Sequence, residues 1–176
     1  METWSRLLRS LDLSAAGASA HELARELYPL PRSMTGDGVR ETLRLLAREL
    51  PLTCHEVPSG TDVLDWQVPP EWNVREAWLA GPDGRRLVDL RDSTLHVVGY
   101  SAPVRERLTL AELLPHLHSD PGRPHAVPYR TAYYRRAWGL CLPHDQLVAL
   151  PEGEYEVCID ATLEPGSLTY GEILLP

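Results

Sequence analysis

The residue types that could do chemistry are concentrated between Pro128 and Gly139. The aromatic residues of this stretch are Tyr129, Tyr133, Tyr134 and Trp138, and its arginines are Arg130, Arg135 and Arg136. Arginine binds carboxylates in a bidentate manner, and tyrosine or tryptophan offers a rigid apolar wall with a polar tip, so the stretch could form a substrate-binding rim. Alternatively, the aromatics alternate along a β-strand and pack a core while the arginines face water. The residues alone favour the strand, because this composition is common in strands.

Nucleophilic catalysis lacks its usual motifs in this sequence. No Gly-x-Ser-x-Gly occurs, and Pro58-Ser59-Gly60 has the wrong flanking residues. Cys54 precedes His55, but neighbours on an alternating strand point to opposite faces and so cannot cooperate. The three cysteines, Cys54, Cys141 and Cys158, are far apart and odd in number. We therefore expect buried thiols in a reducing compartment.

One compact group has the residue types of a metal site, namely His116-x-His118 followed by Asp120. Both histidines fall at the expected end of a helix, where they would favourably face the helix dipole and solvent, and this position favours a surface role. The sequence contains no His-Glu-x-x-His, no P-loop and no Gly-x-Gly-x-x-Gly, so it supports neither a zinc-protease helix nor a nucleotide cofactor.

Charge and hydropathy exclude two classes of partner. The chain has 17 arginines, no lysine and 25 acidic residues, which gives a net charge of −8. Nucleic acid is a poor partner for such a surface, since its binding relies on clustered positive charge. No apolar run approaches the roughly 20 residues that cross a bilayer, and residues 1–13 carry charges where a signal peptide would be apolar. The expectation is a cytoplasmic protein with no membrane partner.

Three helices are expected before Pro51, which would end the last of them. Residues 3–12 place apolar side chains at helical spacing. A second helix is predicted from Ser19, where a capping-box pattern reaches Glu22. The third follows Gly38 and has one apolar stripe, with charged residues on its other faces.

After residue 51 the pattern becomes that of strands. A turn at residues 81–84 predicts a hairpin, and a capping box from Thr109 to Glu112 predicts a short helix that leads to the proline-rich loop 118–128. A clean alternation over residues 153–163 predicts a half-buried strand. The predicted strands are 52–57, 73–80, 85–90, 95–100, 153–163 and 168–175, with the proline-broken stretch 63–72 as the first domain boundary.

Five ordered strings carry a resemblance to a known family. They are residues 28–36 (YPLPRSMTG), 63–74 (VLDWQVPPEWNV), 95–101 (LHVVGYS), 128–142 and 166–172 (GSLTYGE). Together they resemble the bacterial aminopeptidase-like family related to the co-catalytic zinc aminopeptidases, in which a small β-rich domain of unknown function interrupts the peptidase fold. The resemblance extends from about Ala20 to Pro176.

The resemblance implies a mixed α/β fold, in which the N-terminal helices of a zinc-peptidase-like α/β core are interrupted by a β-rich inserted domain. Residues 1–60 would be the N-terminal helical part, 61–152 the inserted domain, and 153–176 the first returning strands of an incomplete, truncated core. The family's metal ligands belong to a later segment that this sequence does not contain. The resemblance therefore implies no cofactor in this chain and zinc in the complete family member.

In functional terms, the resemblance implies an N-terminal fragment of a metal-dependent aminopeptidase-like hydrolase. It would be inactive alone and would act on a peptide or a small amide when completed. The alternative is a non-catalytic binding or assembly module, for which an exposed hydrophobic edge would favour homo-oligomers. No catalytic residue is assigned. By the same resemblance, the substrate-binding candidates are His96, Tyr129, Arg130, Tyr133, Tyr134 and Trp138, with Arg130 as an anchor for a substrate carboxylate.

Overall fold

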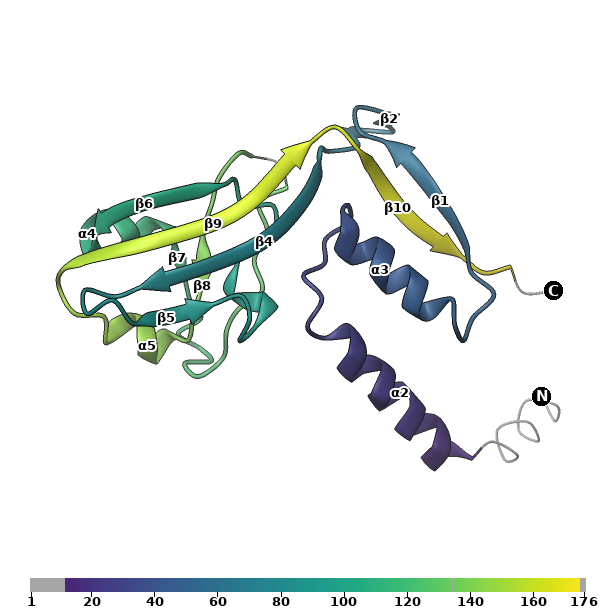
Figure 1. Ribbon diagram of the computed structural model, residues 1–176, viewed down its shortest axis with the longest axis horizontal. Coiled ribbons are helices and arrows are strands. Elements are labelled where there is room, and N and C mark those ends of the chain that lie inside the picture. The colour runs from purple at the N-terminus through teal and green to yellow at the C-terminus, as the bar shows by residue number, and fades with distance from the viewer. Residues whose placement is uncertain (1–11, 134, 175–176) are drawn as a thin grey trace. The chain divides into compact units, whose positions relative to one another are not determined.

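A computed structural model of the chain describes residues 12–133 and 135–174 (Figure 1). It contains two compact units, Met1–Leu30 and Pro31–Pro176. The helix predicted over residues 3–12 lies almost wholly outside the described residues. Helices and strands both occur, as the mixed fold class predicted.

The first unit contains helix α2 (Leu13–Leu27). The carboxylate of Asp12 accepts the backbone N–H groups of Ser14 and Ala15, each at 3.0 Å, and so caps the helix. The predicted start at Ser19 was therefore wrong. The alanine-rich residues 15–20 have high helix propensity, which allows the helix to extend back to the Asp12 cap.

The second unit opens with helix α3 (Asp37–Leu46), which ends before Pro51 in a run of turns. Strands β1 (Thr53–Pro58) and β10 (Ser167–Glu172) form an antiparallel ribbon, and α3 lies against β10. Cys54 is exposed on β1, so the prediction that all three cysteines are buried was wrong for this one. The reason is that a ribbon of only two strands leaves side chains such as this one without a covering layer.

A four-stranded antiparallel sheet holds the main core of the second unit. Its strands are β4 (Glu71–Ala80), β5 (Arg86–Asp89), β6 (Val104–Thr109) and β9 (Glu154–Glu164), in the spatial order β5-β4-β9-β6 (Figure 1). The predicted hairpin and the predicted alternating strand are both confirmed. Tyr155, Val157 and Ile159 point into the core, while Cys158 is buried on the opposite face.

Short elements cover the inner face of this sheet. They are η1 (Thr94–His96), α4 (Leu110–Leu113), η2 (Leu114–His116), β7 (Leu117–His118), β8 (Leu140–Cys141) and α5 (His144–Val148). The predicted capping box at Thr109 is confirmed. The strand predicted over residues 95–100 was wrong, because η1 begins the segment and Tyr100 ends it with a left-handed φ of 66°.

The stretch from Pro128 to Gly139 forms no strand in the part that the structure describes. Its strand interpretation was therefore wrong. Thr131 makes one isolated parallel bridge with Gly99, and the rest is loop. Pro128 has no N–H group to donate to a β-ladder hydrogen bond. The aromatic side chains each pack against a different neighbour and do not share one sheet face.

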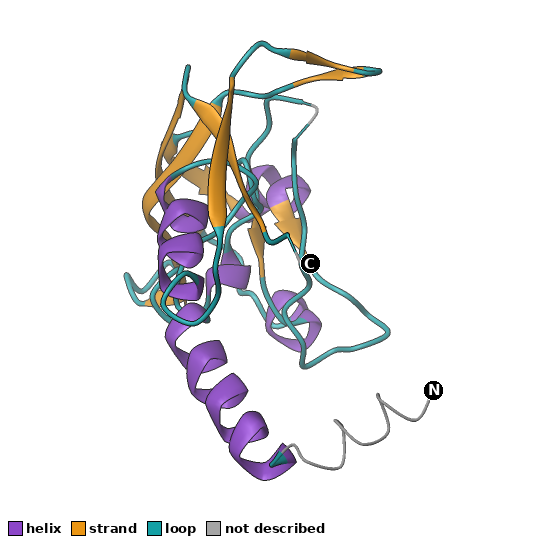
Figure 2. Ribbon diagram, turned by 90° about the vertical axis from the view of Figure 1, so that its right-hand side faces the viewer, coloured by secondary structure: helices purple, strands orange, loops and turns teal. Residues whose placement is uncertain are grey.

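A miniature hairpin completes the second unit. Strands β2 (Asp62–Val63) and β3 (Trp66–Gln67) pair antiparallel around Leu64 and Asp65, and the hairpin forms the top of Figure 2. Leu64 has a left-handed φ of 54°.

Candidate functional site

Segments far apart in the sequence meet around Thr35, which is 1% exposed. Its hydroxyl oxygen accepts the backbone N–H of Trp72 at 3.0 Å and lies 2.5 Å from the hydroxyl of Tyr100. Thr35 also forms an antiparallel bridge with Leu168, and the ring of Tyr100 meets that of Tyr133 edge to face at 4.9 Å. Each of the five strings that carry the family resemblance therefore contributes one residue to this cluster.

The indole of Trp72 stabilises the left-handed backbone at Tyr100 through two contacts, one with the Tyr100 ring and one with the next residue, Ser101. The two rings stack with centroids 5.9 Å apart, and the Trp72 Nε1–H donates to the carbonyl of Ser101 at 2.9 Å. Burial raises the pKa of the Tyr100 hydroxyl, which is therefore neutral at physiological pH. The cluster is a buried, hydrogen-bonded support and not a source of protons.

Replacing Thr35 with valine tests this support. We expect the free energy of unfolding to fall by about 2 kcal/mol, because the Trp72 N–H and the Tyr100 hydroxyl are left buried without their partner. Urea unfolding measures the change. Thr35→Ser keeps the hydroxyl and should cost less than Thr35→Val, so equal losses in the two variants would contradict the assigned role of the hydroxyl.

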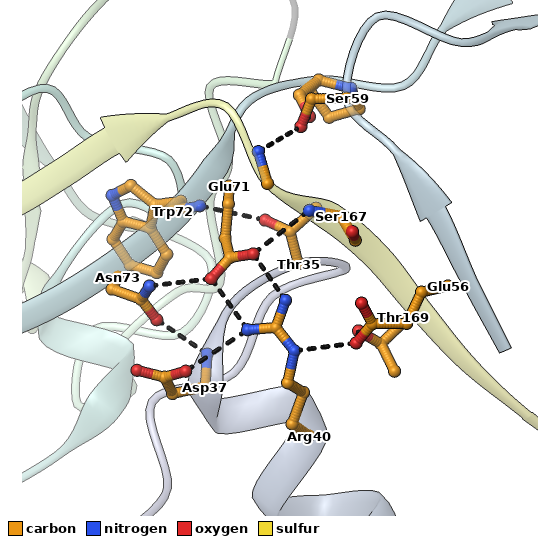
Figure 3. Close-up of polar contacts among 12 residues, drawn as sticks. Thr35, Asp37, Arg40, Glu56, Ser59, Glu71, Trp72, Asn73, Ser167 and Thr169 are labelled. Carbon is orange, nitrogen blue, oxygen red and sulfur yellow. Dashed lines mark hydrogen bonds and ion pairs between the residues drawn. The ribbon is translucent and has the colours of Figure 1, made fainter. Parts of the chain in front are cut away.

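An ion-pair network lies beside this cluster and joins α3 to β1, β4 and β10 (Figure 3). The guanidinium of Arg40 binds both carboxylate oxygens of Glu71, at 2.8 and 2.5 Å. The Arg40 Nε–H also donates to Glu56 at 3.0 Å, and Glu71 accepts the backbone N–H of Ser167 at 3.2 Å. Asn73 accepts the first backbone N–H of α3, that of Asp37, at 2.7 Å.

Glu71 is the most enclosed acid of this network, with a side chain that is 15% exposed. The Arg40 guanidinium, reinforced by the Ser167 N–H and the Asn73 amide, lowers the pKa of Glu71 to about 2. The same pairing raises the pKa of Arg40. Both groups are therefore charged at any physiological pH. The network fixes the β1–β10 ribbon and α3 to Glu71, the first residue of β4.

Tyr133, which contacts Tyr100, also lines a small apolar pocket. It has a volume of about 130 Å³ and is lined by Met34, Trp66, Gln67, Pro69 and Tyr133. None of these side chains carries a charge, and the one amide among them, that of Gln67, donates to Asp62 at 3.1 Å. The lining of the pocket is therefore uncharged and mainly apolar.

Two of the predicted substrate-binding residues lie at the surface, in the loop that leads to Tyr133. Tyr129 is 66% exposed, and its hydroxyl lies 3.2 Å from that of Tyr133. Burial around the hydroxyl, followed by this hydrogen bond, raises the pKa of Tyr129 to about 12. Arg130 is exposed, and its backbone carbonyl accepts the N–H of Gly99 at 2.9 Å, which anchors the loop beneath it. Tyr134 lies outside the described residues.

Two further predicted residues do not join this group. His96 is half-buried, and its Nδ1 lies 2.8 Å from the carbonyl oxygen of Cys141. Trp138 is half-buried and stacks on His116 with centroids 3.7 Å apart. The structure thus brings Tyr129 and Tyr133 together, places Arg130 next to Tyr129 in the chain, and gives His96 and Trp138 partners within the fold.

The histidine pair considered as a metal site does not fit a zinc ion. Burial and the positive charges of Arg130 and Arg135 lower the pKa of His118, and the same charges would repel a cation. The carboxylate of Asp120 is held by Arg123 at 2.9 Å. Residues 12–133 and 135–174 contain no group of three or more His, Cys, Asp or Glu that could hold a metal ion.

A serine–histidine pair not predicted from the sequence lies at the start of α5. Ser119 Oγ is 2.9 Å from His144 Nδ1. A catalytic pair also needs a group that orients the histidine and donors for an oxyanion. Within the described ranges, His144 makes no other side-chain hydrogen bond, so the arrangement lacks the remainder of a triad.

Sequence reasoning missed the residues that the structure connects most densely, namely Thr35, Arg40, Glu71 and Asn73. Their signal was weak. Glu71 lies within the string 63–74, and Arg40 is one of the charged residues on the faces of its helix that lie outside the apolar stripe. Only the strings 28–36 and 63–74, which contain three of the four, indicated that these segments matter.

Comparisons with known proteins agree with this geometry. A family model described as "Domain of unknown function (DUF2172)" matches residues 71–162, a range that begins with β4 and ends within β9. A Clostridium acetobutylicum protein named "Putative polysaccharide biosynthesis protein with aminopeptidase-like domain" is 45% identical over 159 residues, which are 90% of this chain. A solved structure from the same organism, described as a "putative peptidase", matches with a TM-score of 0.86 at 45% identity and covers 90% of this chain.

This chain spans 37% of the length of each of these two relatives. Among the described residues, no helix combines the length and the apolar character needed to cross a membrane.

Proposed function

This chain belongs to the DUF2172 family of domains of unknown function, and we propose from that premise that it forms the N-terminal part of an aminopeptidase-like hydrolase. The observation that carries the proposal is the match to the solved peptidase-like structure, at 45% identity and a TM-score of 0.86 over 90% of this chain. The names of both relatives support a peptidase-like activity for the whole protein. Its substrate would be a peptide or a small amide.

Metal-dependent chemistry, if the whole protein uses it, would rest on ligands supplied by polypeptide beyond this chain. The described residues have no fitting metal group, so their proposed contribution is structural and substrate-binding. Zinc is the ion that the family resemblance suggests. The three free cysteines support a reducing compartment, for which we propose the cytoplasm.

The domain division stays a proposal. Residues 1–60 and 153–176 would belong to the peptidase-like core, and residues 61–152 would form the inserted domain. The pairing of β9 with β4 and β6 favours a later second boundary, after Glu164. The pairing of β1 with β10 supports placing those two strands together.

Extending the chain through its downstream reading frame tests the proposed function. Metal content and leucyl-anilide hydrolysis would be measured for this chain and for the extended chain. Two zinc ions and turnover in the extended form only would support the proposal. A metal-free, inert extended form would instead favour the second candidate, a non-catalytic binding module, which the exposed aromatic surface around Tyr129 supports.

Arg130 is the proposed anchor for a substrate carboxylate, because its side chain is exposed and forms no ion pair with an acid among the described residues. In the extended, active protein we expect Arg130→Ala to raise KM about tenfold with kcat nearly unchanged, which is the loss of one charge-assisted hydrogen-bond pair. Steady-state kinetics measures this. Arg136→Ala, in the same loop, is the control, and an unchanged KM for Arg130→Ala would refute the anchor.

A further inference from the structure

Leu64 occupies an unusual position at the tip of the β2–β3 hairpin. It is fully exposed, at 101% of its reference area, and has a left-handed φ of 54°. Turns of this kind favour glycine, asparagine or aspartate, because a larger side chain is strained there. No contact within residues 12–133 and 135–174 buries Leu64, so the folded chain alone gives no reason for leucine at this place.

The apolar pocket defined above begins two residues away on the same hairpin, at Trp66 and Gln67. Its volume of about 130 Å³ is close to that of dry apolar cavities, on the order of 150 Å³, that bind a benzene-sized group. A leucine side chain is of that size. Because Leu64 is fully exposed, it does not fill the pocket of its own chain.

The rim of the pocket has the composition of an interface. Trp66 is 36% exposed and Tyr129 is 66% exposed, and the hydroxyl of Tyr129 is bonded to Tyr133 in the pocket wall. Tryptophan and tyrosine are among the residues most enriched as interface anchors, and a central apolar pocket is where such anchors bind.

We propose that this chain forms a two-fold symmetric dimer in which Leu64 of each copy inserts into the Met34–Tyr133 pocket of the other. A two-fold interface requires one self-complementary patch, and the hairpin carries both the projecting group and the matching pocket. A peptide or small ligand would account for the pocket but not for an exposed, strained leucine beside it. The proposal does not rest on the peptidase-like function.

The net charge of the chain makes the proposed dimerisation depend on ionic strength. Each copy has a net charge of −8, so two copies repel each other at low ionic strength. The contact itself is apolar and is strengthened by kosmotropic salts such as sulfate. The dimer should therefore tighten as salt rises, which is the opposite of an interface made by ion pairs.

Sedimentation velocity on this 176-residue chain tests the dimer. Over about 1 to 500 µM protein, we expect a concentration-dependent shift from monomer to dimer, as a small interface gives affinities in the micromolar range. Leu64→Asp and Gln67→Trp should each keep the chain monomeric, the first by removing the inserted group and the second by filling the pocket. Val148→Asp, at a residue of α5 that is 69% exposed, should dimerise like the wild type.

Mixing the two monomeric variants tests the reciprocal geometry. Leu64→Asp retains an open pocket and Gln67→Trp retains the leucine, so the mixture should form a heterodimer through one of the two contacts, more weakly than the wild type. Circular dichroism confirms that each variant is folded. The proposal would be overturned if the wild type stays monomeric throughout, or if the dimer survives Leu64→Asp. It would also be overturned if Val148→Asp weakens dimerisation as much as Leu64→Asp, or if the two folded variants fail to associate when mixed. A monomer whose pocket binds benzene would overturn it too, by assigning the pocket to a ligand.

Discussion

Replacing Gly36 with alanine should reduce the free energy of unfolding by at least about 3 kcal/mol, because strain and a collision act together. Gly36 has φ 92° and ψ 179°, a region that is essentially restricted to glycine. A Cβ at this position would overlap the backbone carbonyl of Trp72 and lie 2.7 Å from Asn73 Oδ1. Asn73 accepts the first N–H of α3, so relief of the collision would also displace the start of that helix.

Gly84→Ala is the matched control for this variant. Gly84 also has a positive φ, 77°, but a Cβ there would meet no atom within 4 Å. It therefore measures conformational strain alone, which should cost about 1–2 kcal/mol. Chemical denaturation of both variants gives the comparison. Equal losses would show that the close approach of Gly36 to β4 has no energetic role.

Removing the charge of Glu71 is expected to have an effect of similar size. Lowering the pKa of this carboxyl from 4.5 to about 2 corresponds to roughly 3 kcal/mol in favour of the ionised form. Glu71→Gln loses that contribution and leaves Arg40 with only its weaker partners, Glu56 and Asp37. We expect a lower free energy of unfolding near pH 7, measured by urea denaturation. Glu41→Gln, which removes a surface acid from α3, should change stability little.

The pH dependence follows from the direction of the pKa change. Because folding lowers the pKa of Glu71, its contribution is fully present above about pH 4.5 and is lost as the pH falls toward about 2. The difference in stability between the wild type and Glu71→Gln should therefore shrink on acidification. A difference as large at about pH 3 as at about pH 7 would show that the glutamine acts by altering packing and not by removing charge.

Local sequence patterns correctly predicted the elements that are determined by interactions between residues close together in the sequence. The alternation over residues 153–163 predicted β9, because one face of that strand packs the core, and the capping box at Thr109 predicted the start of α4. The strand predicted over residues 95–100 failed because the left-handed backbone of Tyr100 is stabilised by Thr35 and Trp72, which lie far away in the sequence. The residues next to Tyr100 in the sequence therefore could not reveal its left-handed conformation.

The site was less predictable than the fold for the same reason. Arg40 looked like one more charged residue on a solvated helix face, and only the packing of α3 beside β4 shows that its guanidinium binds Glu71 in a bidentate manner. The loop from Pro128 to Gly139 attracted attention by composition. Composition, however, could not distinguish Tyr129, whose ring is exposed, from Trp138, which stacks on His116.

The chain enters and leaves the four-stranded sheet at neighbouring points. Glu71 begins β4 and Glu164 ends β9, and these two residues are register partners at one end of the β4–β9 ladder. Cross-strand partners lie about 5 Å apart, so the intervening segment is attached to its flanks at two adjacent points. Recombination can insert or remove a segment of this kind without separating the flanking ends. A hairpin turn between Pro58 and Ser167, which are register partners, would suffice to join β1 to β10 without the four-stranded sheet.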